Sequence, residues 1–166
     1  LKPKKYIHNA LYRIVSDRIN GFIAVSDEVE QAIRQTIRVD QRRITTICNG
    51  VDVRRYQRKV DRTAIRASLA LKEEDQVMIL VGTLKEQKGH YYLIQAAAPL
   101  IAKNNNLHIL FPGDGPLRAS LQQQVQHLGL EKNIHFLGSR KDIPDLLAAS
   151  DYFVLPSLWE GLAMAL

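Results

Sequence analysis

The sequence contains a single cysteine, Cys48, and this scarcity limits the chemistry open to the chain. One thiol excludes a disulfide within the chain and cannot build a cysteine metal cluster, which suits a reducing compartment. We expect Cys48 itself to be a small, buried, apolar residue. No apolar run approaches the roughly 20 residues that a membrane-spanning helix requires. The sequence therefore predicts a cytoplasmic protein.

Two further absences exclude classes of binding protein. The basic residues are not interleaved with aromatic residues and form no known nucleic-acid motif, so no nucleic acid is expected as a partner. No strand-like segment is followed by Gly-x-Gly-x-x-Gly, which disfavours a dinucleotide-dependent dehydrogenase. The composition is otherwise that of an ordinary globular α/β protein, with 46% hydrophobic and 24% charged residues.

The net charge of +6 is concentrated in one part of the chain. Residues 1–59 contain 13 Lys and Arg against 6 Asp and Glu, whereas residues 60–166 contain 10 against 11. One interpretation is attraction of the basic part to a phospholipid-linked acceptor or to an anionic membrane, as a peripheral contact at its inner face. The other is a solvated basic surface with no partner, and the sequence does not decide between them.

The order of apolar segments predicts two units. The first has a helix over residues 4–19, a short strand at 22–25, a helix from residue 27 to about 38 and a strand at 43–47. After a polar stretch with a short helix near 63–71, the chain alternates regularly. Strands are expected at 77–82, 107–111, 134–137 and 152–155, and helices at 89–103, 117–128 and 143–149. This alternation predicts a Rossmann-like α/β parallel sheet with flanking helices, which binds ligands at the carboxyl ends of its strands.

The loops after the first two of these strands contain residues suited to a phosphorylated ligand. Lys88 lies just before a helix start, where its ammonium could neutralise a diphosphate. The alternative is a solvated lysine, such as any strand–helix loop can carry. Gly113 and Asp114 allow a tight turn ahead of a helix, and this turn serves either to shape the loop or to contact the ligand.

The third and fourth loops offer contacts of a different kind. Arg140, next to Ser139, either stacks on a base or is solvated. Glu160 precedes Gly161 and Leu162, which begin a helix. Because a helix N-terminus favours phosphate, a carboxylate beside it suggests sugar hydroxyls as a further partner. A simple favourable interaction of Glu160 with the helix dipole is the alternative.

These segments resemble the family 4 (group 1) retaining glycosyltransferases of the GT-B fold. The segment Val81-Gly82-Thr83-Leu84, followed by Lys88-Gly89, is similar to the family's Val-Gly-Arg-Leu-x-x-x-Lys-Gly. Gly113-Asp114-Gly115-Pro116 matches a second motif, and Pro156-Ser157-x-x-Glu160-Gly161 is similar to the start of the family's Glu-x7-Glu motif. Asn49-Gly50-Val51-Asp52 resembles the end of the family's acceptor domain. The resemblance spans roughly residues 20–166.

The resemblance implies a partial GT-B architecture. Residues 1–57 would be the C-terminal part of the acceptor-side domain with a linker, and residues 58–166 a nucleotide-sugar-binding donor domain, truncated at its C-terminal end. The second glutamate of the Glu-x7-Glu motif would fall two residues beyond Leu166. We therefore expect a fragment of a longer protein, inactive by itself.

The implied reaction moves a sugar from a UDP- or GDP-linked donor to a hydroxyl of a sugar or lipid-linked acceptor, with retention of configuration. It belongs to polysaccharide or glycolipid biosynthesis and needs no metal or other cofactor. A phosphate oxygen of the donor would help to remove the acceptor proton. Glu160 and Lys88 would be the catalytic residues, with Glu160 positioning the sugar. The implied donor-binding residues are Gly82, Thr83, Lys85, Gly113, Asp114, Ser139, Arg140, Gly161 and Leu162.

Thr83 departs from the family pattern, which has an arginine on the donor phosphates at this position. A hydroxyl cannot stabilise a departing diphosphate as a guanidinium does. Lys85 is the nearest cation that could compensate. The departure keeps open a non-catalytic nucleotide-sugar-binding module. A nucleotide-sugar 2-epimerase on the same architecture is a further alternative, although it would require an acid/base set in both domains.

Overall fold

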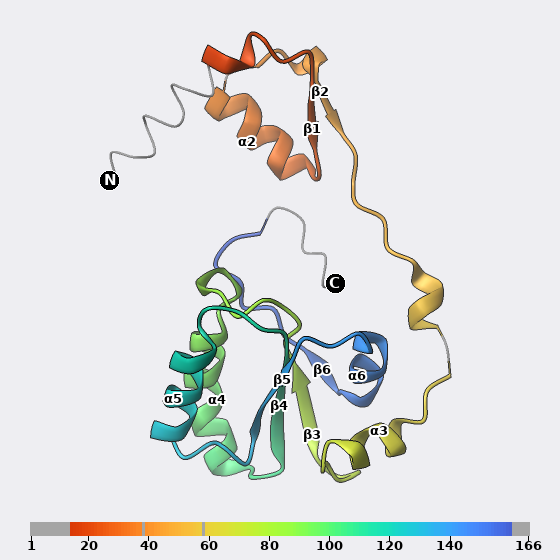
Figure 1. The fold of residues 1–166 in the computed structure, drawn as a ribbon, viewed down its shortest axis with the longest axis vertical. Helices are drawn as coiled ribbons and strands as arrows, with labels where there is room; N and C mark the ends of the chain where they lie inside the picture. The colour runs from red at the N-terminus through yellow and green to blue at the C-terminus, as the bar shows by residue number, and fades with distance from the viewer. Residues whose placement is uncertain (1–13, 38, 58, 161–166) are drawn as a thin grey trace. The chain divides into compact units, whose positions relative to one another are not determined.

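The computed structural model describes residues 14–37, 39–57 and 59–160 (Figure 1). The chain divides into two compact units, one that ends at Val51 and one that runs from Asp52 to Glu160. Most of the helix expected over residues 4–19 lies outside the described residues, and residues 14–16 are helical. Gly161 and Leu162 also lie outside them. No helix in the described ranges is long and apolar enough to span a bilayer.

The first unit pairs two short parallel strands beside one helix. Strand β1 (Phe22–Ala24) runs alongside β2 (Ile44–Thr46), with Phe22 opposite Ile44. Helix α2 (Asp27–Ile37) lies between them in sequence, and a 3-10 turn, η1 (Gln41–Arg43), precedes β2. The Ser26 hydroxyl accepts a hydrogen bond from the Val29 N–H and so caps α2. The expected strand–helix–strand order is therefore confirmed, with slightly shorter elements.

The second unit is built on a four-stranded parallel sheet in the order β5-β4-β3-β6. The strands are β3 (Gln76–Ile79), β4 (Leu107–Pro112), β5 (Ile134–Gly138) and β6 (Tyr152–Phe153). All four lie where the sequence predicts strands, although β3 and β6 end earlier. Backbone hydrogen bonds nevertheless continue past β3, from the Leu80 N–H to Leu110 and from the Gly82 N–H to Pro112.

Helices cover both faces of this sheet (Figure 1). On one face, α4 (His90–Lys103) and α5 (Arg118–His127) pack with the sheet around Phe111, Ile94 and Leu121. On the other face, α3 (Arg62–Ser68) and α6 (Ile143–Ala149) pack with it around Ile79, Leu110 and Leu146. A further 3-10 turn, η2 (Val53–Tyr56), precedes α3. This three-layer α/β arrangement is the one the sequence predicts.

The order of the strands reverses at a defined point of the sheet. The chain moves from β3 through β4 to β5, and then returns to the other side of β3 for β6. Parallel sheets bind ligands at such a reversal, outside the carboxyl ends of the strands. The two segments that border it here are the loop after β3 (residues 80–89) and the segment after β6 (residues 154–160).

Two expectations about single side chains have different outcomes. Cys48 is exposed, so the prediction of a buried apolar cysteine is wrong. It follows β2 by two residues, beyond the short run that packs against α2. His135 in β5 is packed, as expected, because its ring stacks on His108 of β4 with the ring centres 5.4 Å apart.

Candidate functional site

The loop after β3 folds its lysine back over its own glycine. The 3-10 turn η3 (Glu86–Lys88) ends at Gly89, which adopts the left-handed conformation with a φ of 71°. A Cβ built on Gly82 would lie 3.3 Å from three methylene carbons of Lys88. The methylene chain of Lys88 therefore packs against Gly82, and this packing restricts the positions that the Lys88 ammonium can take.

Gly89 also lets the segment after β6 approach the start of α4. A Cβ at this position would lie 2.1 Å from the Pro156 carbonyl oxygen, well inside any allowed contact. Both the left-handed φ and the close approach require glycine here. The backbone around Pro156 is thereby held against the helix start that follows Lys88, although the two segments are far apart in sequence.

Lys88 and Glu160 form an ion pair at the sheet reversal. The Lys88 Nζ lies 2.7 Å from the Glu160 Oε1, and the two side chains are only 18% and 22% exposed. The Ser157 hydroxyl donates to the same oxygen at 2.7 Å. Burial opposes ionisation of Glu160, but the hydrogen bonds from Lys88 and Ser157 and the Lys88 charge outweigh it and hold the Glu160 pKa below its usual value. Glu160 is therefore ionised at neutral pH, with Lys88 as its partner.

Gln87 ties the same two segments together through their backbones. Its side-chain amide donates to the Trp159 carbonyl at 2.9 Å and lies 3.4 Å from the Glu160 Oε2. In return, its own carbonyl accepts from the Leu158 N–H at 2.8 Å. These hydrogen bonds join residues more than 70 positions apart in the sequence and hold the Glu160 backbone in place. The sequence analysis did not identify Gln87, because a polar residue in a polar loop is expected to be solvated and matches no motif.

The loops after β4 and β5 join this edge through glycine backbones. Gly113 has a φ of 150°, and a Cβ on it would lie 1.9 Å from the Gly82 carbonyl oxygen. Its N–H donates to the Gly138 carbonyl at 2.7 Å. The structure therefore brings all four loops to one edge of the sheet. Gly82 and Gly113, two of the predicted donor-binding residues, are in contact there.

Asp114 and Arg140, in these two loops, form their side-chain contacts with nearby residues of the chain. Asp114 accepts a hydrogen bond from the Gly115 N–H at 2.8 Å and pairs with Arg118 at 3.3 Å, which shapes the start of α5. Arg140 is held by Asp142, with its Nε 2.8 Å from the Asp142 Oδ1. Ser139, beside it, is exposed. Within the described ranges, no group of three His, Cys, Asp or Glu side chains is arranged to hold a metal ion.

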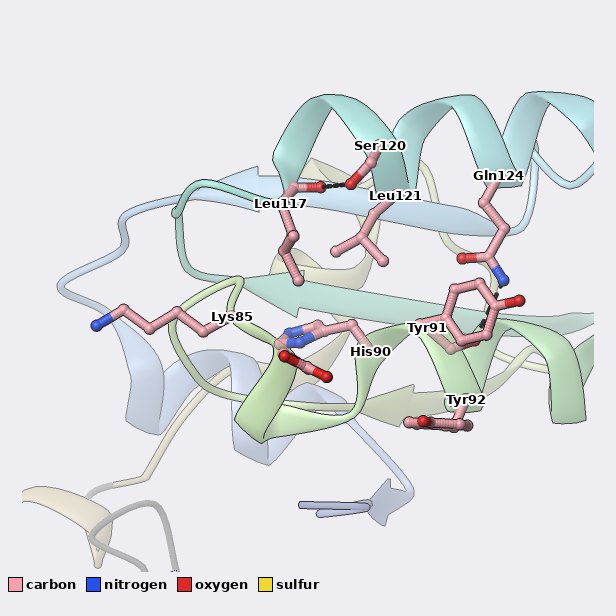
Figure 2. Close-up of a pocket in the computed structure, with 9 residues that line it drawn as sticks. Lys85, His90, Tyr91, Tyr92, Leu117, Ser120, Leu121 and Gln124 are labelled. Atoms are coloured by element: carbon pink, nitrogen blue, oxygen red, sulfur yellow. Dashed lines mark hydrogen bonds between the residues drawn. The ribbon is translucent and has the colours of Figure 1, made fainter. Parts of the chain in front are cut away.

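Thr83 and Lys85 occupy the outer part of the loop after β3. Both residues are exposed, and the Lys85 N–H donates to the Thr83 carbonyl at 2.7 Å. Lys85 has extended backbone angles and lines a pocket between the starts of α4 and α5 (Figure 2). The structure thus separates the two lysines of this loop: Lys88 pairs with Glu160, and Lys85 borders the helices.

Comparisons with known proteins give matches to two family models and to characterised relatives. A family model described as glycosyl transferases group 1 matches residues 61–166, and one described as Glycosyltransferase Family 4 matches residues 1–55. An Escherichia coli UDP-Gal:alpha-D-GlcNAc-diphosphoundecaprenol alpha-1,3-galactosyltransferase is 32% identical over 170 residues, covering 99% of this chain and 44% of that protein. The N-acetyl-alpha-D-glucosaminyl L-malate synthase of Bacillus anthracis is 26% identical, covering 95% of this chain and 41% of its own length.

A similar fold is found among solved structures. The Anabaena protein HepE, crystallised with UDP and glucose, superposes with a TM-score of 0.82 at 26% identity, covering 95% of this chain and 44% of HepE. WaaG, a glycosyltransferase involved in lipopolysaccharide biosynthesis, shares the fold with a TM-score of 0.75. The chain spans a little under half the length of the curated relatives that match nearly all of it.

Proposed function

Because the chain belongs to the group 1 glycosyltransferases, we propose that its second unit binds the nucleotide-sugar donor of a transferase with a GT-B fold. The observation that carries the proposal is the Lys88–Glu160 pair at the reversal of the sheet. A cation and a carboxylate within 2.7 Å of each other suit a ligand that combines a diphosphate with a sugar. UDP is the favoured nucleotide, because the E. coli relative is named for UDP-Gal and HepE was crystallised with UDP.

In this proposal the donor exchanges partners with the ion pair. The diphosphate takes the Lys88 ammonium, and Glu160 is released to hydroxyls of the donor sugar. Lys88 then stabilises the negative charge that develops on the departing diphosphate, in a site where it is already positioned by Gly82 and Gly89. Glu160 positions the sugar and forms no bond to it. Backbone N–H groups near Gly113 and in the segment containing Gly161 and Leu162 complete the phosphate contacts.

The finer features of the reaction belong to the same proposal. The transfer retains the anomeric configuration, with a donor phosphate oxygen helping to remove the acceptor proton, and Lys88 serves as the cation in place of a metal ion. The acceptor is a sugar or lipid-linked hydroxyl at the cytoplasmic face of a membrane, as the diphosphoundecaprenol in the name of the E. coli relative suggests. Proton NMR of the product gives its anomeric configuration, and activity should persist in excess EDTA.

The exposed Thr83 favours one second candidate, a binding module without turnover. Within the described residues, the cation that forms an ion pair with Glu160 is Lys88, and Thr83 adds no charge to it. A module of this kind would bind UDP-sugar as the transferase does and release it unchanged. Activity of the intact protein with a UDP-sugar and a lipid-linked acceptor therefore separates the two candidates.

The binding step is tested by Lys88→Ala in the intact protein. A hydrogen bond to a charged group is worth about 1.5–3 kcal/mol, so UDP-sugar affinity should fall about 10- to 150-fold by calorimetry. Lys103→Ala, at the far end of α4, removes the same charge away from the site and should leave the affinity unchanged. Equal affinities of the two variants would overturn the proposal.

A further inference from the structure

A second concave site lies on the α4–α5 face of the second unit (Figure 2). It is a pocket of about 330 Å³ between the first residues of α4, the first two turns of α5, and Lys85 and Glu86 of the loop after β3. Its volume falls in the range of about 300–1,000 Å³ that small-molecule sites occupy. Neither Lys88 nor Glu160 lines it, so the pocket is separate from the ion pair.

Three buried polar atoms of the residues that line this pocket lack hydrogen-bond partners among the described residues. His90 is only 1% exposed, and neither of its ring nitrogens has a partner among the described residues. The side-chain oxygen of Gln124 is likewise buried without a partner, while its nitrogen donates to the Tyr91 carbonyl at 3.2 Å. Buried polar groups are nearly always satisfied, so each of these atoms requires an explanation.

The missing partners define what a ligand must offer. A neutral imidazole has one donor and one acceptor nitrogen, and an amide oxygen is an acceptor. A ligand that satisfies them must therefore donate as well as accept hydrogen bonds. Hydroxyl groups do both, whereas a phosphate group at neutral pH offers almost only acceptors. Burial, with a smaller contribution from the Lys88 charge, lowers the His90 pKa to about 4, so its ring is neutral at pH 7.

The remaining lining is mostly apolar or aromatic and carries no net charge, since Leu117, Ser120 and Leu121 lie beside two tyrosines. Tyr91 and Tyr92 are 48% and 51% exposed, with their rings edge to face at 5.5 Å. Such half-exposed aromatic side chains offer an apolar surface together with a polar hydroxyl. Lys85 and Glu86 contribute one charge of each sign. Because these two charges cancel, the lining offers no net attraction to a nucleotide or a free phosphate. A neutral ring with hydroxyl edges and C–H faces matches the polar atoms and the aromatic surface of the pocket.

We propose that the α4–α5 pocket binds a neutral carbohydrate ring, at a site distinct from the one that holds the donor phosphates. The hydroxyls of the ring pair with His90 and the Gln124 oxygen, and its C–H face packs on the tyrosines. The inference does not depend on the transferase proposal, since the hydrogen bonds it uses come from His90 and Gln124, which contact no donor in that proposal. Lys85 and Glu86 belong to the same loop as Lys88, so the two sites lie on neighbouring parts of one segment.

The test uses saturation-transfer NMR on the intact protein with the methyl glycosides of glucose, galactose and N-acetylglucosamine. Samples are measured without UDP and with UDP at saturation, which occupies the donor site. At least one glycoside should show transfer, and Tyr92→Ala and Gln124→Leu should each weaken its binding at least about fivefold. Tyr152→Ala is the matched control, because Tyr152 on β6 is as exposed as Tyr92 and lies outside the pocket.

Three outcomes would overturn the inference. The first is the absence of transfer to all three glycosides both with and without UDP. The second is transfer only in samples without UDP, which would assign the glycosides to the donor site. The third is an equal loss of binding in Tyr152→Ala and Tyr92→Ala. Thermal unfolding of each variant, monitored by circular dichroism, confirms that it is folded, and the exposure of both tyrosines makes folding of these variants the expected result.

Discussion

The variant Glu160→Gln should bind UDP more tightly than the wild type while transferring sugar more slowly. In the structure the Lys88 ammonium is paired with the Glu160 carboxylate, so a diphosphate that binds Lys88 has to displace this carboxylate. Glutamine keeps the size of the side chain and can still accept from Ser157, but it removes the competing charge. Tighter binding of the nucleotide together with slower transfer is not expected of a residue that merely stabilises the fold.

The magnitude follows from the geometry of the pair. A charge-assisted hydrogen bond contributes about 1.5–3 kcal/mol, and the Glu160 side chain, 22% exposed, recovers part of this from water and Ser157 once it is displaced. We therefore expect a net gain of about 1–2 kcal/mol, which corresponds to UDP affinity about 5- to 30-fold higher. Turnover should fall because the sugar loses its positioning carboxylate.

Calorimetric titration with UDP measures the first effect, and an initial-rate assay with a UDP-sugar measures the second. Glu86→Gln is the matched control, because it removes the same charge from the loop that contains Lys88, at a residue that lines the α4–α5 pocket instead. A long-range field effect would raise the UDP affinity of both variants. The displacement argument fails if Glu160→Gln binds UDP no more tightly than the wild type, or if Glu86→Gln matches it.

Three further predictions concern stability and the loop after β3. Burial lowers the pKa of His90 to about 4, so the unfolded state takes up a proton before the folded state does as the pH falls. The free energy of unfolding should therefore drop between about pH 6.5 and 4 by up to about 3 kcal/mol. Urea unfolding of His90→Phe should lack this part of the pH dependence. Arg66, 1% exposed, donates to four backbone carbonyls and to Asp151, so Arg66→Ala should cost about 3–5 kcal/mol in denaturant unfolding. Arg62→Ala removes a more exposed partner of the same carboxylate and should cost at most about 1 kcal/mol. In an active transferase Lys85→Ala should lower turnover about 10²–10³-fold while Thr83→Arg is tolerated or raises it, and ordinary rates in Lys85→Ala would contradict compensation by Lys85.

The sheet of the second unit could be predicted because its strands are short apolar runs that alternate with helical segments. Burial of such runs on both faces leaves few alternatives to a parallel sheet, and the loops that follow them must then share one edge. This is why the sequence alone places Lys88 and Glu160, 72 residues apart, at the same edge. Element ends were less predictable, as β3 and β6 show, since strand ends depend on pairing with neighbours.

Contacts between a side chain and a distant backbone could not be predicted. Gln87 gains its importance from the Trp159 carbonyl, and Arg66 from carbonyls of Lys72, Glu73 and Asp75. From the sequence, an arginine in a short polar helix is expected at the surface. The sequence pattern gives residue types, but it does not show which backbone carbonyls will face the arginine. The burial of Arg66 is decided by the backbone that surrounds it.

Because Thr83 carries no charge, the position of Lys85 decides whether a second cation can reach the donor phosphates. Residues three apart in a 3-10 helix lie on the same side, but Lys85 precedes η3 with φ −125° and ψ 157°, so it does not share the direction of Lys88. To reach a diphosphate beside Lys88, Lys85 has to change side-chain rotamers while its backbone stays in place. Ordering a lysine side chain costs at most about 2 kcal/mol, which two charge-assisted bonds to phosphate would exceed. Compensation by Lys85 is therefore energetically accessible, but it would withdraw the charge of Lys85 from the α4–α5 pocket and leave Glu86 there unbalanced.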